Sequence, residues 1–167
     1  MTPAAKTTTT KRTRKPKVKQ KLPPNPFMNE ILNLVNEQTT TAKKISILKE
    51  YETDALKSLL IWNFDPTAIT VLPAGDVPFK PNENPLGTDH SSLRREWKNF
   101  YLFVKGGNDT LSPIRRETIF IQLLEGLHPD EAKIVCLVKD KKLTDEYKIT
   151  KDMVSEAYAD IVWGGRS

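Results

Sequence analysis

Residues 112–139 read SPIRRETIFIQLLEGLHPDEAKIVCLVK, and this stretch indicates the fold class most directly. Two prolines, Pro113 and Pro129, each follow a residue that can cap a helix, and proline is favoured at the first helical position. Two acidic residues after Pro129 complement the positive end of a helix. The stretch therefore predicts two successive helices, one ending near Gly126 and one opened by His128. Their apolar residues are Ile114, Phe120, Leu123, Leu124 and Leu127 in the first, and Val135, Cys136 and Val138 in the second.

The same helical spacing of apolar residues recurs on both sides of this pair. It predicts five further helices, over residues 26–35, 41–51, 54–62, 93–104 and 150–161. We expect Asn25-Pro26 to open the first of them and Thr150 to cap the last. The alternation that is typical of a β-sheet is nearly absent. We therefore predict an all-α protein, a compact bundle of about seven helices.

The most regular pattern lies in residues 93–104, just before Gly106-Gly107, a pair that typically ends a helix. The apolar residues follow the spacing of one helical face. They are Leu93, Trp97, Phe100, Tyr101 and Val104. We expect a continuous α-helix here, with its three aromatic side chains packed in the core and not available for stacking on bases.

A Pro-rich segment, residues 65–89, contains five of the twelve prolines, which excludes a helix. The segment is long for a connection inside a compact domain, yet it keeps several apolar residues. They are Ile69, Val71, Leu72, Val77 and Phe79. We expect an ordered loop held against a single helical domain of residues 27–167, with room for one short strand.

The N-terminal segment, residues 1–26, carries eight basic residues and no acidic one, and we call it the basic tail. The whole chain has 26 basic and 21 acidic residues, so residues 27–167 carry 18 basic and 21 acidic residues, a net charge of −3. All the net positive charge therefore lies in the tail. Its composition predicts disorder and attraction to polyanions. A tail that only solubilises the protein or binds a scaffold is the alternative.

Residue types that carry catalysis are scarce. The chain has two histidines and one cysteine, and they are not spaced as metal ligands. We expect His128 to cap a helix and Cys136 to be a buried structural thiol. No apolar stretch approaches the roughly 20 residues that a membrane helix needs. The sequence thus predicts a non-catalytic protein with no cofactor, no metal site and no membrane partner.

Three basic groups in the helical domain stand near predicted helix ends, where phosphate contacts are favoured. They are Arg94-Arg95, Arg115-Arg116 and the group of Lys139, Lys141 and Lys142. Cations in the first turn of a helix are disfavoured unless an anion neutralises them, and a salt bridge to Glu117 or another acid is the alternative to a phosphate for the arginine pair 115–116. Trp163 is a further candidate for surface contact. The predicted nucleic-acid-binding residues are Lys11, Arg12, Arg14, Lys15, Lys17, Lys19, Lys21, Arg115, Arg116, Lys139, Lys141 and Lys142.

Several of these segments resemble the helical N-terminal DNA-binding domain of ATP-dependent DNA ligases of tailed bacteriophages. The resemblance is carried by residues 30–33 (EILN), 42–49 (AKKISILK), 55–60 (ALKSLL), 115–117 (RRE), 120–127 (FIQLLEGL), 129–133 (PDEAK) and 138–143 (VKDKKL). The arrangement, with its Pro-rich middle loop, is also similar to a family of small uncharacterised proteins of large tailed phages. It covers roughly residues 27–162.

The resemblance implies an all-α module that grips duplex DNA through the minor groove with loops and helix ends. It does not imply ligase catalysis, because that needs a Lys-x-Asp-Gly motif and the chain contains no Asp-Gly pair. We therefore expect a free-standing, sequence-independent nucleic-acid-binding protein of a tailed phage, with duplex DNA as the expected ligand. Its expected location is the cytoplasm of an infected bacterial host or the virion.

Two other functions stay open. One is a protein-interaction adaptor or virion component, in which the basic tail and the Pro-rich loop bind phage or host replication or virion proteins. The other is an enzyme or enzyme regulator that acts in trans with a separate ligase or polymerase.

Overall fold

The computed structural model describes residues 22–85 and 90–166. Within these residues the chain forms seven α-helices and two 3₁₀-helices and no β-strand, which confirms the predicted all-α class. The elements are α1 (Met28–Glu37), α2 (Thr41–Glu50), α3 (Asp54–Phe64), α4 (Leu93–Glu96), η1 (Trp97–Phe103), α5 (Pro113–Gly126), α6 (Pro129–Lys139), η2 (Leu143–Asp145) and α7 (Lys151–Ala157). The predicted disorder of the basic tail falls almost wholly outside the described residues and stays a prediction.

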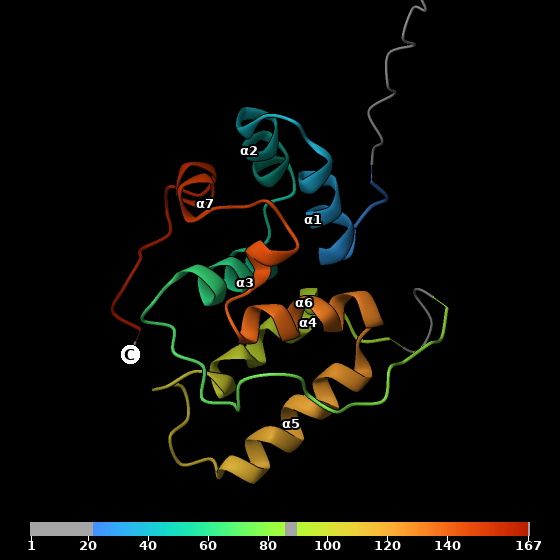
Figure 1. The fold of residues 1–167 in the computed structure, drawn as a ribbon, viewed down its shortest axis with the longest axis vertical. Helices are drawn as coiled ribbons and strands as arrows, with labels where there is room; N and C mark the ends of the chain where they lie inside the picture. Colours follow the sequence, from blue (N-terminus) through green and yellow to red (C-terminus); the bar gives the residue numbers. More distant parts are fainter. Residues whose placement is uncertain (1–21, 86–89, 167) are drawn as a thin grey trace, which may run out of the picture.

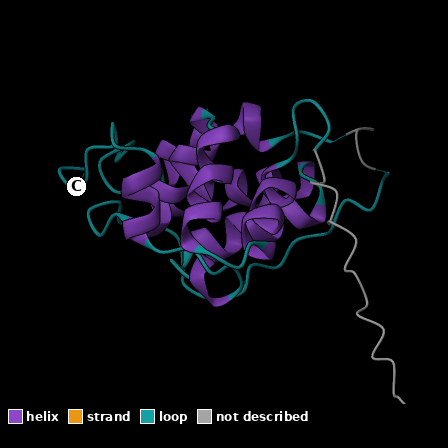
Figure 2. Cartoon of the chain, turned by 90° about the horizontal axis from the view of Figure 1, so that it is seen from above, coloured by secondary structure: helices purple, strands orange, loops and turns teal. Residues whose placement is uncertain are grey.

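The helices are arranged in three tiers, with α1, α2 and α7 at one end of the long axis, α3, α4 and α6 in the middle, and α5 at the other end (Figure 1). One hydrophobic core includes residues from every α-helix. The middle tier lies at its centre, because α3 packs against α4, η1 and α6, and Leu56, Leu59 and Leu60 of α3 are fully buried. Seen from above, the helices fill the body and the loops run around its edges (Figure 2).

Three helices begin around one buried carboxylate, that of Glu131 in the first turn of α6. Its oxygens accept hydrogen bonds from Met28 N, the first residue of α1, at 3.0 Å, and from Leu93 N, the first residue of α4, at 3.3 Å. A carboxylate is favoured at the positive end of a helix, and here it satisfies N–H groups that lack partners within their own helices. Burial raises the pKa of Glu131, and the two N–H donors oppose that rise.

The predicted opening of the first helix at Asn25-Pro26 is wrong, because α1 begins at Met28. Asn25 has a left-handed backbone with φ 53°, and the buried Pro26 uses its carbonyl to accept a hydrogen bond from Arg94 Nε at 2.9 Å. The helix start is set instead by Glu30, whose carboxylate accepts from the backbone N–H of the preceding Phe27 at 3.2 Å. Such a contact from the first turn back to the N-cap is a recognised helix-start signal.

The predicted caps of three later helices are confirmed. Ser112 Oγ, His128 Nδ1 and Thr150 Oγ1 each accept a backbone N–H from the first turn of α5, α6 and α7. The last helix is shorter than predicted, because α7 ends at Ala157 and not near residue 161. The next residue, Tyr158, is buried and donates its hydroxyl proton to Leu48 O of α2 at 2.5 Å, and the chain continues as an irregular segment.

The predicted continuous α-helix over residues 93–104 is wrong. Only its first turn, α4, is α-helical, and the rest winds as the 3₁₀-helix η1. The end of η1 is paired with the Pro-rich segment, since Val71 N donates to Phe103 O at 2.9 Å. This pairing draws the backbone of Val104 into an extended conformation and so prevents a helical turn there.

The 3₁₀ winding changes which aromatic side chains face the core. A 3₁₀-helix has three residues per turn, so side chains three apart lie on the same face. Phe100 and Phe103 therefore point into the core, and Trp97 is partly buried against it. Tyr101 is 51% exposed, so the expectation that it packs in the core is wrong.

The described part of the Pro-rich segment, residues 65–85, lies on the helices without forming a strand. Thr70 makes one antiparallel bridge with Val104, in place of the short strand for which the sequence left room. Further along, Lys80 N donates to the Glu125 carboxylate of α5 at 3.1 Å. The segment is thus attached to the helical domain at separate points, by the Thr70 bridge and by the Lys80 hydrogen bond.

Candidate nucleic-acid interface

Seven of the predicted binding residues belong to the basic tail and lie outside the described residues. They are Lys11, Arg12, Arg14, Lys15, Lys17, Lys19 and Lys21. The structure does place the point where the tail joins the fold. Leu22 packs against the core, and the chain then enters α1 beside the starts of α4 and α6. The tail is therefore attached to the helical domain where three helices begin.

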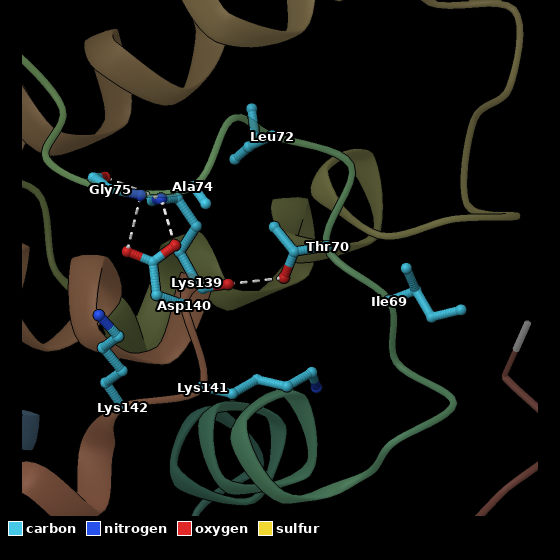
Figure 3. Close-up of a pocket in the computed structure, with 9 residues that line it drawn as sticks. All are labelled: Ile69, Thr70, Leu72, Ala74, Gly75, Lys139, Asp140, Lys141 and Lys142. Carbon is cyan, nitrogen blue, oxygen red and sulfur yellow. Dashed lines mark hydrogen bonds and ion pairs between the residues drawn. The ribbon is translucent and has the colours of Figure 1, made fainter.

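The predicted basic run at the end of α6 lines an open hollow of about 320 Å³, shown in Figure 3. The other wall is formed by residues of the Pro-rich segment between Ile69 and Gly75. The Lys139 side chain is fully buried, and its Nζ donates to Pro73 O at 2.8 Å, Gly75 O at 3.1 Å and Asp140 Oδ1 at 2.6 Å. These three acceptors match the three protons of an ammonium group. Lys139 therefore holds the Pro-rich segment and has no proton left for a phosphate.

The backbone at this end of α6 forms a Schellman motif, in which Lys142 N donates to Leu137 O and Lys141 N donates to Val138 O. The motif requires a left-handed residue at the first position after the cap, and glycine is the usual choice. Here Lys141 occupies that position with φ 56°. A non-glycine residue in this conformation costs about 1 kcal/mol.

The Lys141 side chain offsets that cost by contacts within the fold. Its Nζ donates to Trp62 O at 2.5 Å and to Asp65 O at 2.9 Å, two carbonyls at the end of α3. Carbonyls at the end of a helix lack partners inside the helix, and a cation is favoured there. Burial lowers the pKa of Lys141, and the nearby Asp65 charge opposes that change.

The hollow itself offers little chemistry. Asp140 is its one carboxylate, and its oxygens accept from Lys139 Nζ and from Gly75 N at 3.3 Å. The Thr70 hydroxyl donates to Lys139 O at 2.8 Å and accepts from the Trp62 indole at 2.9 Å. Lys142 is exposed, and its side chain forms no hydrogen bond or ion pair with another described residue. The hollow is therefore a junction between elements, and among the described residues that line it Lys142 is the free cation.

The two predicted arginines of α5 have different surroundings. Arg116 is 8% exposed, and its guanidinium donates to the carbonyls of Leu102 (2.9 Å), Asn108 (3.0 Å) and Leu111 (3.1 Å). It ties the start of α5 to the loop after η1, and within the described residues neither arginine forms the alternative salt bridge to Glu117. Arg115 is exposed, and its side chain has no partner in the described part of the chain.

Another set of free cations lies on α4, on η1 and just after η1, in and next to the segment where the sequence predicted a core helix. Arg95, Lys98 and Lys105 are exposed, and among residues 22–85 and 90–166 their side chains form no hydrogen bond or ion pair. Tyr101 lies exposed between them along the chain. Arg95 belongs to a predicted basic group, but Lys98, Tyr101 and Lys105 were missed. The available signal for Lys98 and Tyr101 was their spacing of three, which aligns them on one face of a 3₁₀-helix.

Groups that could support catalysis or metal binding remain few. The rings of His90 and His128 lie 5.3 Å apart, although the sequence separates them widely. In the described residues no three or more His, Cys, Asp or Glu side chains are grouped so that they could hold a metal ion. Cys136 is half-buried, and burial raises the pKa of its thiol to about 11, which keeps it protonated at neutral pH. Trp163 is partly buried, with Lys151 Nζ 5.1 Å from its ring.

The described residues thus define an all-α protein with several separate basic sites on its surface. Comparison with known families then identifies the chain as a member of the family described as "Family of unknown function (DUF6433)", whose profile matches residues 31–145. The matched range runs from α1 to η2 and includes neither the basic tail nor α7. Comparisons with curated proteins and with solved structures found no match. The helices of the described residues include none that is long and apolar enough to span a membrane.

Proposed function

We propose that this protein binds nucleic acid without sequence specificity and without catalysing a reaction on it. Its expected ligand is duplex DNA, as in the ligase domain that the helical segments resemble. The basic tail supplies most of the affinity by neutralising phosphates, and the helical domain supplies orientation. The proposed setting is a tailed phage, either in the cytoplasm of the infected host or in the virion.

The observation that carries the proposal is the division of charge. The tail has eight basic residues and no acidic one, whereas residues 27–167 have a net charge of −3. A polyanion would therefore be attracted to the tail first. The contacts of Arg116, Lys139 and Lys141 support this division, since three cations of the helical domain are used within the fold.

The test is to delete residues 1–21, which leaves Leu22 on the core, and to measure duplex affinity by fluorescence anisotropy as a function of salt. Each phosphate neutralised contributes about 0.9 to the slope of log affinity against log salt, so the loss of eight cations lowers the slope by up to about 7. We expect the affinity at low salt to fall by about 100-fold or more.

Two matched controls separate charge from chain length. Replacing all eight basic residues of the tail by glutamine should reproduce the deletion, and shuffling the order of residues 11–21 should leave the affinity unchanged. Curves for the deleted protein that coincide with those of the full chain would refute the proposal. A single stoichiometric protein partner that survives nuclease treatment would favour the adaptor or virion component instead.

A further inference from the structure

We propose that Arg95, Lys98 and Tyr101, which we call the Tyr101 ridge, bind unpaired nucleotides of a nucleic acid. The phenol ring stacks on an exposed base, and the two cations neutralise the neighbouring phosphates. This inference rests on the proposed function and adds to it a surface of the helical domain and a preference between paired and unpaired strands.

The helical winding of α4 and η1 places the three side chains on one face. Lys98 and Tyr101 are three apart within the 3₁₀-helix η1 and so lie on the same face. Arg95 precedes Lys98 by the same interval and belongs to α4, the α-helical turn that η1 continues, and residues three apart are also neighbours on the surface of an α-helix. The buried aromatic ring of Phe100 occupies the opposite side. One face of this element thus packs in the core, and the other presents two cations and an aromatic ring.

The ridge is free of partners inside the fold. Tyr101 is 51% exposed, and neither its hydroxyl nor the Arg95 and Lys98 side chains form a hydrogen bond or ion pair with any described residue. The acidic residue nearest to the ridge in the sequence is Glu96. Its carboxylate accepts hydrogen bonds from the Ser91 hydroxyl at 2.6 Å and from Asn99 Nδ2 at 3.1 Å. The positive charge of the ridge is therefore available to an external anion.

The backbone under the ring is held by close packing. A Cβ atom at Gly107 would lie 1.8 Å from Tyr101 O, so only glycine allows the turn after η1 to approach so closely. The backbone N–H of Gly106, at the start of this turn, donates to the Asp109 carboxylate at 3.1 Å. This carboxylate therefore has a hydrogen-bond partner within the turn. A platform that is already held loses less conformational entropy when a ligand binds.

The chemistry of the ridge favours unpaired over paired strands. Bases inside a duplex are stacked on their neighbours and present no free face, whereas an unpaired base can stack on an exposed aromatic ring. Stacking of this kind is insensitive to sequence, because every base has a flat face. Two flanking cations add a salt-dependent contribution from phosphates. The same ridge gives a duplex only the contribution of the cations.

The experiment compares the full chain with Tyr101→Ala and Tyr101→Phe on two fluorescent probes, an oligothymidylate of about 12 nucleotides and a duplex of about 12 base pairs. We expect Tyr101→Ala to lower affinity for the single strand by about tenfold and to leave duplex affinity within about twofold. Tyr101→Phe keeps the ring and should bind both probes like the unmodified chain. Val162→Ala removes another exposed apolar side chain, 74% exposed, and should change neither affinity.

The outcomes separate this inference from the proposed function. An unchanged single-strand affinity for Tyr101→Ala, or an equal loss on both probes, overturns the ridge while tail-dependent duplex binding still stands. A full chain that binds neither probe overturns both. Lys98→Ala provides a further measurement: it should reduce the single-strand salt slope by about 0.7, whereas Lys49→Ala on α2 should leave it unchanged.

Discussion

Two basic regions of this protein use the same kind of side chain in opposite ways. At the end of α6, Lys139 and Lys141 turn inward and donate to carbonyl groups of other segments. On α4 and η1, Arg95 and Lys98 are exposed, and their side chains form no hydrogen bond or ion pair with other described residues. The sequence predicted nucleic-acid binding for the region at the end of α6 and core packing for the helix that contains η1. Charge alone therefore does not show whether a basic side chain is free to contact a ligand.

The reason for the difference lies in what each region faces. The Pro-rich segment and the end of α3 present carbonyls that have no partner in a helix or sheet, and buried carbonyls need donors. A lysine can reach such carbonyls over a distance that a backbone N–H cannot. Within residues 22–85 and 90–166 no carbonyl accepts from the Arg95 or Lys98 side chain, so these cations remain free there.

The largest expected effect concerns Lys139, whose side chain turns inward at the end of α6. Lys139→Met keeps the length of the side chain but removes the ammonium, leaving Pro73 O, Gly75 O and the Asp140 carboxylate without their shared donor. Breaking one partner of a buried charge pair typically costs about 3–5 kcal/mol, and we expect a loss of about 3 kcal/mol in the free energy of unfolding because Asp140 is partly exposed. Urea denaturation followed by circular dichroism measures it.

Lys142→Met is the matched control for this prediction, since Lys142 belongs to the same run but is exposed. Its effect on stability should stay within about 0.5 kcal/mol. Lys139→Met should also leave the duplex affinity of the folded protein unchanged. A Lys139→Met protein that is as stable as the unmodified chain but binds duplex more weakly would reverse the comparison between the two regions.

The fold class and most helix starts could be predicted because their signals are local. Ser112, His128 and Thr150 each cap a helix through a residue only two or three positions away. The end of the helical winding at Phe103 could not be predicted, because the Phe103 carbonyl accepts a hydrogen bond from Val71, which is far away in the sequence. A periodic pattern of apolar residues cannot show that a distant segment will form a hydrogen bond with the backbone at the end of the helix.

The candidate site was less predictable than the fold for the same reason. Lys139 and Lys141 resemble free cations until the carbonyls of Pro73 and Trp62 are placed beside them. These partners lie 66 and 79 positions away in the chain. The exposure of Tyr101 likewise depends on the winding of η1 and not on its own neighbours in the sequence. Only the charge of the basic tail is a purely local property.

The next prediction concerns Asp65 at the end of α3, whose backbone carbonyl accepts a hydrogen bond from Lys141. Burial alone would raise the pKa of its carboxyl, but hydrogen bonds from Thr67, Gly164 and Arg166 outweigh burial and lower the pKa to about 2 from an ordinary 3.8. A carboxyl whose pKa is lowered by folding stabilises the protein above its unfolded pKa. That contribution is lost as pH falls from about 4 to about 2, and it amounts to about 2 kcal/mol.

Urea denaturation at several pH values between about 2 and 5 tests this prediction, with Asp65→Asn as the reference. The difference in stability between the two proteins should shrink as pH falls through this window. Glu131, whose pKa is raised by burial, is present in both proteins and so cancels from the difference between them. Asp160 also has a lowered pKa, through Lys57, but it titrates equally in both proteins. A difference that stays constant with pH would show that Asp65 does not titrate as described.

The smallest expected effect separates backbone from side chain at Lys141. Its left-handed conformation, φ 56°, is strained for any residue with a Cβ atom, whereas its ammonium contacts Trp62 O and Asp65 O. Lys141→Ala and Lys141→Gly both remove the ammonium, but only glycine relieves the strain. We therefore expect Lys141→Gly to be more stable than Lys141→Ala by about 1 kcal/mol, measured by urea denaturation. The unmodified chain should equal or exceed Lys141→Gly if the two hydrogen bonds offset the strain. A Lys141→Gly protein clearly more stable than the unmodified chain would mean that the inward lysine is retained at a net cost to stability, and it would return Lys141 to the group of candidate binding residues.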